Sequence, residues 1–133
     1  NGSWVYPPGG TPREVDFLGG NAQVLAALAS GTCTQILLVS SMGTTEPDSY
    51  LDRMGNGHAL FYKLNQEAFL MGAAAAARPN PTAFTVVKPG GLTNDAGGNS
   101  TLLVGLEDSI QDTVMIARAD VAAVLTAALL QPE

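Results

Sequence analysis

Residues 35–43, QILLVSSMG, decide the fold of this chain. Four consecutive apolar residues, from Ile36 to Val39, precede two serines, and the stretch ends on a methionine and a glycine. A run without polar alternation is typical of a strand buried on both faces of a parallel sheet, although a buried helix segment gives the same pattern. The shortness of the run and its polar end favour the strand. Ligands of parallel sheets bind just beyond the carboxyl ends of the strands, so Ser40 and Ser41 become candidate site residues.

A helix is predicted before this strand, over residues 12–30. Thr11 is a candidate N-cap, and Glu14 three residues later completes a capping-box pattern. Gly19 and Gly20 lower the helix propensity of this segment. Two such small residues would also allow a neighbouring strand or helix to approach closely.

After the strand, the sequence predicts a polar loop, a second helix, a second buried strand, two short extended segments and a final helix. These cover, in that order, residues 43–56, 57–77, 84–87, 102–104, 114–116 and 120–130. A helix between two strands predicts parallel strands with a right-handed crossover. Two strands alone leave unpaired edges and uncovered faces, so we expect another chain or a missing N-terminal half to complete the sheet. The predicted fold class is α/β, a partial Rossmann-like doubly wound fold with parallel strands and flanking helices.

The composition of the 133 residues argues against several partners and sites. The net charge of -6 argues against nucleic acid, whose phosphates need a basic surface. No stretch reaches the roughly 18 apolar residues of a membrane-spanning helix. Cys33 is the single cysteine, which excludes an internal disulfide and a thiolate metal cluster, and we expect it to be a small core residue. The chain has no initiator methionine and no signal-peptide pattern, so we expect a processed product or a piece of a longer protein.

Several short motifs follow one another at consistent spacings along the chain. They are Thr11-Pro12-x-x-Val15-Asp16-Phe17-x-Gly19, Val39-Ser40-Ser41-Met42-Gly43, Gly55-Asn56-Gly57, Tyr62-Lys63-x-x-x-Glu67, Lys88-Pro89-Gly90-Gly91-Leu92, Leu103-Val104-Gly105 and Arg118-Ala119-Asp120-Val121-Ala122. Together they resemble the atypical short-chain dehydrogenase/reductase group, which comprises NAD(P)-binding, NmrA-like and NAD-dependent epimerase-like proteins. The resemblance implies that residues 1–133 form one incomplete NAD(P)-binding Rossmann-like domain, with NAD or NADP as cofactor. It covers only the C-terminal part of that fold, because the glycine-rich G-x-G-x-x-G fingerprint does not occur in these residues.

The same resemblance implies residue roles. Ser41 matches the catalytic serine of active superfamily members, and Lys63 matches the lysine that lowers the pKa of a tyrosine acid/base and binds the nicotinamide ribose. The implied cofactor-binding residues are Ser40, Ser41, Lys63, Pro89, Gly90, Gly91 and Leu92. The tyrosine should stand four residues before the lysine, so that one helix face carries both, but that position is Ala59. The adjacent Tyr62 would point about 100° away from Lys63 on a helix, and we expect it to serve packing.

Each candidate also has an ordinary structural interpretation. Ser41 would equally suit a strand-terminal serine that caps its own loop. Lys63 would equally suit a solvated helix lysine that faces Glu67. His58, the single histidine, has no carboxylate or cysteine at the spacing of a triad or metal site, so we expect a polar helix-start residue and no metal centre.

Three functions stay open from the sequence. The first is an NAD(P)-binding domain with little or no reductase activity, because the acid/base tyrosine is absent. The second is a non-catalytic structural or accessory subunit of a larger assembly. The third is an oxidoreductase or isomerase for a small organic substrate, which needs a proton donor such as Tyr50 or water. The resemblance to plant and algal proteins suggests a plastid, with the cytoplasm as the alternative.

Overall fold

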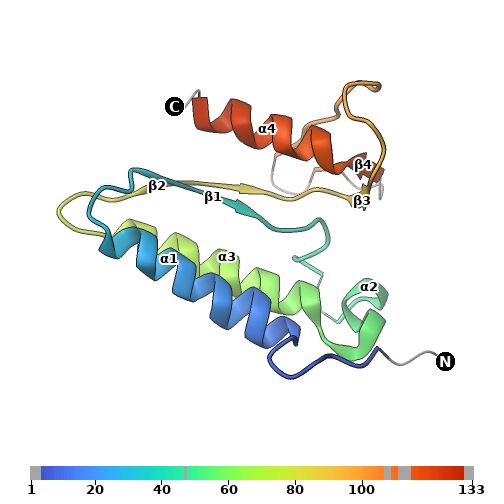
Figure 1. Ribbon diagram of the computed structural model, residues 1–133, viewed down its shortest axis with the longest axis horizontal. Helices are drawn as coiled ribbons and strands as arrows, with labels where there is room; N and C mark the ends of the chain where they lie inside the picture. Colours follow the sequence, from blue (N-terminus) through green and yellow to red (C-terminus); the bar gives the residue numbers. More distant parts are fainter. Residues whose placement is uncertain (1–3, 47, 107–108, 111–114, 131–133) are drawn as a thin grey trace.

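The computed structural model describes residues 4–46, 48–106, 109–110 and 115–130. The elements are η1 (Arg13–Gly19), α1 (Gly20–Ala29), β1 (Gln35–Val39), α2 (Tyr50–Arg53), η2 (Met54–Asn56), α3 (Ala59–Ala76), β2 (Ala83–Val87), β3 (Gly91–Thr93), β4 (Met115–Ala117) and α4 (Arg118–Leu130). Helices α1 and α3 lie side by side on one face of β1 and β2, and α4 lies on the other face (Figure 1). This arrangement confirms the predicted α/β class with parallel strands and flanking helices.

The two central strands pair in parallel, as predicted. Their register runs from Gln35 opposite Ala83 to Val39 opposite Val87. The pairing continues beyond both strands, because the backbone N–H of Ser40 donates to the carbonyl of Val87 at 2.8 Å. The N–H of Met42 donates to the Pro89 carbonyl at 3.0 Å in the same way. The serine-bearing and glycine-bearing ends therefore lie side by side.

The first helix begins with the predicted capping box. The backbone N–H of Thr11 donates to Glu14 Oε2 at 3.3 Å, and the backbone N–H of Glu14 donates to Thr11 Oγ1 at 3.3 Å. The helix is a π-helix through η1 and an α-helix from Gly20 onwards. A Cβ added at Gly20 would stand 1.8 Å from Nε2 of Gln66 on α3. The glycine therefore permits the close approach between the first helix and α3 that the sequence indicated.

The core lies between α1, α3 and the covered face of the sheet. Val24, Leu70 and Ala74 are buried together, and Ile36 and Leu38 of β1 pack against them. Leu70 has no exposed surface. Burial of an apolar side chain of this size stabilises a fold by about 1.5–3 kcal/mol, so this small cluster anchors both helices to the sheet.

Several predicted boundaries were wrong. The segment predicted as a loop contains α2 and a 3₁₀ turn, and Ser49 caps α2 by accepting a hydrogen bond from the Asp52 N–H at 3.3 Å. Helix α3 begins at Ala59, two residues later than predicted, because His58 has the left-handed values φ 51° and ψ 50°. Residues 102–104 form no strand, and their side chains are exposed. Without a partner strand, their apolar side chains have no sheet face to pack on.

The second strand pair was predicted only in part. Strand β3 follows directly from the glycines and pairs in parallel with β4, with Gly91 opposite Met115. Val114, which begins the predicted segment 114–116, lies outside the described residues. Cys33 is half-buried and is not the core residue that the sequence predicted. It precedes β1, and its Sγ lies 3.4 Å from the Gln35 carbonyl. Within the described ranges, no helix is long and apolar enough to span a membrane.

Candidate functional site

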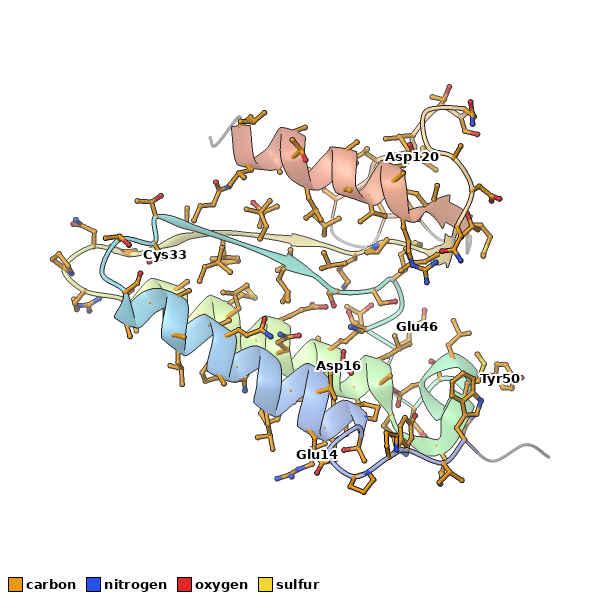
Figure 2. All side chains as sticks on the ribbon, in the orientation of Figure 1. Glu14, Asp16, Cys33, Glu46, Tyr50 and Asp120 are labelled. Carbon is orange, nitrogen blue, oxygen red and sulfur yellow. The ribbon has the colours of Figure 1, made fainter. Side chains whose placement is uncertain are left out.

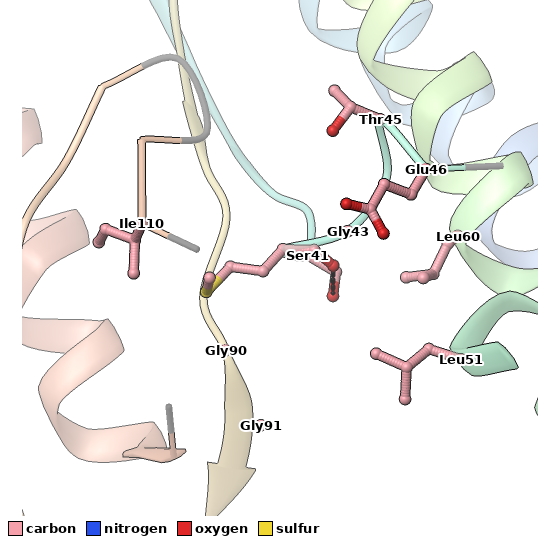
Figure 3. A pocket seen from close by; sticks show the side chains of 10 residues that line it. Ser41, Gly43, Thr45, Glu46, Leu51, Leu60, Gly90, Gly91 and Ile110 are labelled. Carbon is pink, nitrogen blue, oxygen red and sulfur yellow. Dashed lines mark hydrogen bonds between the residues drawn. The ribbon is translucent and has the colours of Figure 1, made fainter. Parts of the chain in front are cut away.

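A cleft of about 420 Å³ opens at the carboxyl ends of β1 and β2 (Figure 3). It is lined by Ser41, Met42, Gly43, Thr45, Glu46, Leu51, Leu60, Gly90, Gly91 and Ile110. The lining therefore joins the serine-bearing end of one strand to the paired glycines that follow the other. This is where open parallel sheets place their ligands.

The two adjacent serines have different surroundings. Successive residues of an extended chain point to opposite sides. Ser40 is buried and its hydroxyl donates to Glu67 Oε1. Ser41 is half-buried, lines the cleft, and its hydroxyl donates to the Met42 carbonyl at 3.0 Å. Of the two hydroxyls, that of Ser41 is the one available to a ligand in the cleft.

Glu67 organises a buried polar cluster beneath the cleft, which we call the Glu67 cluster and which consists of Ser40, Thr44, Glu67 and Lys88. The Thr44 hydroxyl donates to Glu67 Oε1 at 3.0 Å. Lys88 Nζ lies 3.9 Å from Glu67 Oε2, and the two side chains are 20% and 11% exposed. The cluster ties α3 to the ends of both strands. Sequence reasoning missed this cluster. The available signal was Glu67, an acidic residue on a mostly apolar helix, together with the hydroxyl residues that follow the first strand.

Lys63 lies outside the cleft lining and has a carboxylate partner. Its Nζ donates to Asp16 Oδ1 at 2.8 Å, and the two side chains are 26% and 23% exposed. Asp16 lies where the first helix meets α3 (Figure 2). The structure thus gives Lys63 a partner other than the expected Glu67. Its contact with a cofactor stays a prediction.

The other predicted cofactor residues lie at the same edge of the sheet. Gly90 and Gly91 line the cleft, whereas Pro89 contributes the carbonyl that accepts from Met42. Leu92 stands in β3 outside the lining. A Cβ on Gly91 would stand 2.4 Å from the Met115 sulfur, so the glycine leaves room for the Met115 side chain of the neighbouring strand β4.

The aromatic residue next to Lys63 serves packing, as expected. The ring centroid of Tyr62 lies 6.3 Å from that of Phe17 and 5.2 Å from that of Phe61. Ala59 occupies the first residue of α3, so no phenol stands four positions before Lys63. Tyr50 is largely exposed on α2 and does not line the cleft (Figure 2).

His58 is the N-cap residue of α3, which confirms the helix-start prediction, but it has a carboxylate partner that sequence reasoning missed. Its Nδ1 lies 2.9 Å from Oδ2 of Asp52, a side chain only 1% exposed. Burial by itself would raise the pKa of Asp52. The hydrogen bond from the Phe61 N–H at 2.9 Å and the contact with His58 outweigh burial and hold this pKa below its ordinary value. The left-handed backbone at His58 brings the pair together, and no simple spacing rule predicts it.

A model of the NAD(P)H-binding family matches residues 5–132, almost the whole chain. The chain belongs to this NAD(P)H-binding family. The finding confirms the resemblance to the NmrA-like, atypical short-chain dehydrogenase/reductase group. The described residues accordingly form part of an NAD(P)-binding Rossmann-like domain.

Three known proteins are similar to this chain. The chain is 38% identical over 128 residues to sanguinarine reductase of Eschscholzia californica. That alignment covers 95% of this chain and 44% of that protein. The chain is 37% identical to an uncharacterized chloroplastic protein of Arabidopsis thaliana, with 95% and 37% covered. A solved structure from Bacillus halodurans, provisionally described as an NAD-dependent epimerase/dehydratase, matches with a TM-score of 0.67 and 26% identity, with 90% of this chain and 50% of that one covered. The chain thus spans half or less of each.

The cleft suits one end of a nucleotide cofactor of this family. Its volume falls within the range of about 300–1,000 Å³ that is usual for small-molecule sites. Three glycines and two hydroxyls line it, which lets a flat ring approach the backbone beside hydrogen-bonding groups. Among the residues that the structure describes, no group of three or more His, Cys, Asp or Glu side chains is placed to hold a metal ion.

Proposed function

We propose that this chain supplies the nicotinamide side of an NAD(P)-binding site in a Rossmann-like domain. The observation that carries the proposal is the convergence of Ser41, Gly90 and Gly91 on one cleft at the carboxyl ends of two parallel strands. In this proposal Ser41 offers its hydroxyl to the cofactor or substrate. Lys63 reaches the ribose only after it leaves Asp16, because the two side chains are paired in the described structure.

Binding rather than reduction is the main activity that we propose. Reductase chemistry in the superfamily needs a phenol that a nearby lysine makes more acidic. Here the position four before Lys63 is Ala59, and Tyr62 is engaged in aromatic packing. Little or no turnover is therefore expected even where NAD or NADP binds.

Titration of the full-length gene product with NADP and NADPH tests this proposal. We expect saturable binding of at least one of them, weakened by Ser41→Ala. Ser100→Ala is the matched control, because Ser100 lines a separate hollow near β3 and β4. Absence of saturable binding at millimolar cofactor, or equal weakening by both variants, would contradict the proposal.

A partner for the sheet is part of the same proposal. Within the described residues β1 and β2 pair only with each other, so each has one unpaired edge. We propose that a glycine-rich strand–helix unit, from the same protein or another chain, pairs with one of these edges and supplies the rest of the cofactor site. Residues 1–133 expressed alone should then associate or be less stable than the longer protein. A stable, fully folded monomer in analytical ultracentrifugation would argue against this.

The exposed apolar side chains support a second candidate, a structural or accessory subunit in a larger assembly. The first helix exposes Val15, Leu18 and Leu25, each about half exposed. Apolar surface of this kind is common at protein interfaces. Purification of the tagged full-length protein from its native source, followed by sizing, tests this candidate, and a monomer that binds NADPH would count against it.

A third candidate is an active oxidoreductase or isomerase for a small organic substrate. The support is that one relative is named a reductase. NADPH oxidation with candidate substrates would test it, and the double variant Ser41→Ala, Lys63→Ala should abolish turnover. Turnover that survives both changes would eliminate the proposed site.

A plastid location is proposed because one relative is chloroplastic, with the cytoplasm as the alternative. A fluorescent fusion to the carboxyl end of the full-length product distinguishes the two compartments.

A further inference from the structure

Among the described residues, the side chains that line the cleft carry one negative charge and no positive charge. Four of them are apolar, namely Met42, Leu51, Leu60 and Ile110. Ser41 and Thr45 add hydroxyls, and Glu46 adds the one charged group in the described lining. A ligand in this cleft therefore meets apolar walls and a negative charge.

The Glu46 carboxylate is directed toward the open space of the cleft between Ser41 and Leu60 (Figure 3). Its backbone is fixed by hydrogen bonds, since its N–H donates to Gly43 at 3.1 Å and its carbonyl accepts from Ser49. Within the described residues, its carboxylate makes no hydrogen bond or ion pair. The carboxylate is therefore available to a ligand.

The basic side chains nearest in sequence to the lining do not offset this charge. Arg53 lies 3.7 Å from Asp48, Lys63 is paired with Asp16, and Lys88 lies beside Glu67. The whole chain has a net charge of -6. Anionic substrates are normally held by arginine or lysine, and the described lining has neither.

We propose that the cleft selects an apolar organic molecule that carries a positive charge, and that Glu46 is the specificity-determining residue. The inference rests on the proposed NAD(P)-binding function and names the substrate class of the same site. The apolar walls hold the body of the molecule, and the Glu46 carboxylate faces its cationic group. Because Glu46 is exposed, the expected preference for a cation over a neutral molecule of the same shape is about three- to fivefold.

The test uses three small probes of related shape with the full-length protein. (4-Hydroxyphenyl)trimethylammonium is the cation, 4-tert-butylphenol is its neutral isostere, and 4-hydroxybenzoate is the anion. Binding is measured by ligand-observed NMR at low salt, with and without saturating NADPH. Wild type should bind the cation about three- to fivefold more tightly than the isostere and the anion most weakly. High salt should reduce that ratio.

Two variants locate the effect. Glu46→Gln should weaken cation binding to the level of the neutral isostere, and should leave binding of the isostere within about twofold. Asp48→Asn is the matched control, because Asp48 lies on the same loop, is largely exposed and does not line the cleft. It should leave both probes nearly unchanged.

Three results would overturn the inference. They are equal binding of cation and isostere by wild type, equal weakening of the cation by Glu46→Gln and Asp48→Asn, and binding of neither probe at its highest soluble concentration. The NADPH titration without probes separates this failure from that of the proposed function. Saturable NADPH binding with no cation preference rejects the substrate class alone, whereas a cation preference without NADPH binding rejects the cofactor site alone.

Discussion

Helix α3 carries two charged residues four positions apart, and the two have opposite surroundings. Glu67 points to the sheet, where it accepts hydrogen bonds from Ser40 and Thr44 and lies near Lys88. Lys63, one turn earlier, points to the first helix and pairs with Asp16. The motif that joins Lys63 and Glu67 in sequence thus serves two different interfaces, and only the Glu67 cluster adjoins the cleft.

The difference has an energetic consequence. The Glu67 cluster is mostly buried, so its hydroxyls and charges depend on one another in the absence of water. The side chains of Lys63 and Asp16 are 26% and 23% exposed, so this pair is partly hydrated. Removal of one partner should therefore affect the fold much more at Glu67 than at Lys63.

The largest expected effect is that of Glu67→Ala. It leaves two buried hydroxyls without their acceptor and removes the carboxylate beside Lys88, so the free energy of unfolding should fall by about 2–4 kcal/mol. Urea unfolding followed by circular dichroism measures the change. Glu67→Gln is the control, because an amide oxygen still accepts from both hydroxyls, and its loss should be smaller. Equal stability of wild type and Glu67→Ala would show that the Glu67 cluster does not stabilise the fold.

The adjacent serines provide the next test. Ser40→Ala deletes a buried donor to Glu67, and should lower the free energy of unfolding by about 1–2 kcal/mol. Ser41→Ala should change it by less than about 0.5 kcal/mol, because its hydroxyl faces the cleft. NADPH affinity should respond in the opposite order in the full-length protein. The reverse pattern, with Ser41 important for stability and Ser40 for binding, would contradict the assignment of the two side chains.

The sequence predicted those features of the fold that depend on local patterns. The apolar run at residues 35–43 predicted a buried strand, and the Thr11–Glu14 pattern predicted the start of the first helix. The parallel pairing followed from one intervening helix, and with it the meeting of Ser41 with the paired glycines. These inferences need only period, capping and topology.

Most of the missed contacts join residues that are distant in the sequence. Glu67 and Ser40 are 27 positions apart, and Lys63 and Asp16 are 47 apart. An isolated lysine and glutamate four apart on a helix predict a pair, but tertiary packing turned each toward another partner. The Asp52–His58 contact depends on a left-handed residue between two helices, which the composition of that loop does not reveal.

Asp52 is a second buried carboxylate that can be compared with Glu67. It contacts a backbone N–H and a histidine, whereas Glu67 contacts two hydroxyls and lies near a lysine. Because the folded pKa of Asp52 lies below its ordinary value of 3.8, its ionised form stabilises the fold. This contribution is fully present above that value and is lost as the pH falls through the folded pKa. We expect wild type to exceed Asp52→Asn in unfolding free energy by about 1 kcal/mol at neutral pH.

Urea midpoints of both proteins, measured from neutral pH down to about pH 3, check this prediction. The difference between them should stay nearly constant above about pH 5 and shrink below about pH 4. Subtraction of the two curves cancels the other carboxylates, which both proteins share. A difference that grows on acidification would reverse the sign of the assigned shift.

The smallest expected effect concerns Lys63, and it decides whether the lysine has a second role. A double-mutant cycle of Lys63→Ala and Asp16→Ala should give a coupling of about 0.5–1 kcal/mol in unfolding free energy, since the pair is partly hydrated. If Lys63 also reaches the ribose, it must leave Asp16 when NADPH binds. Asp16→Ala should then strengthen NADPH binding by about two- to fivefold, because that separation is no longer needed. Lys63→Ala should weaken binding whether or not Asp16 is present. If both variants leave the NADPH dissociation constant unchanged while the stability coupling persists, Lys63 joins the first helix to α3 and takes no part in the cofactor site.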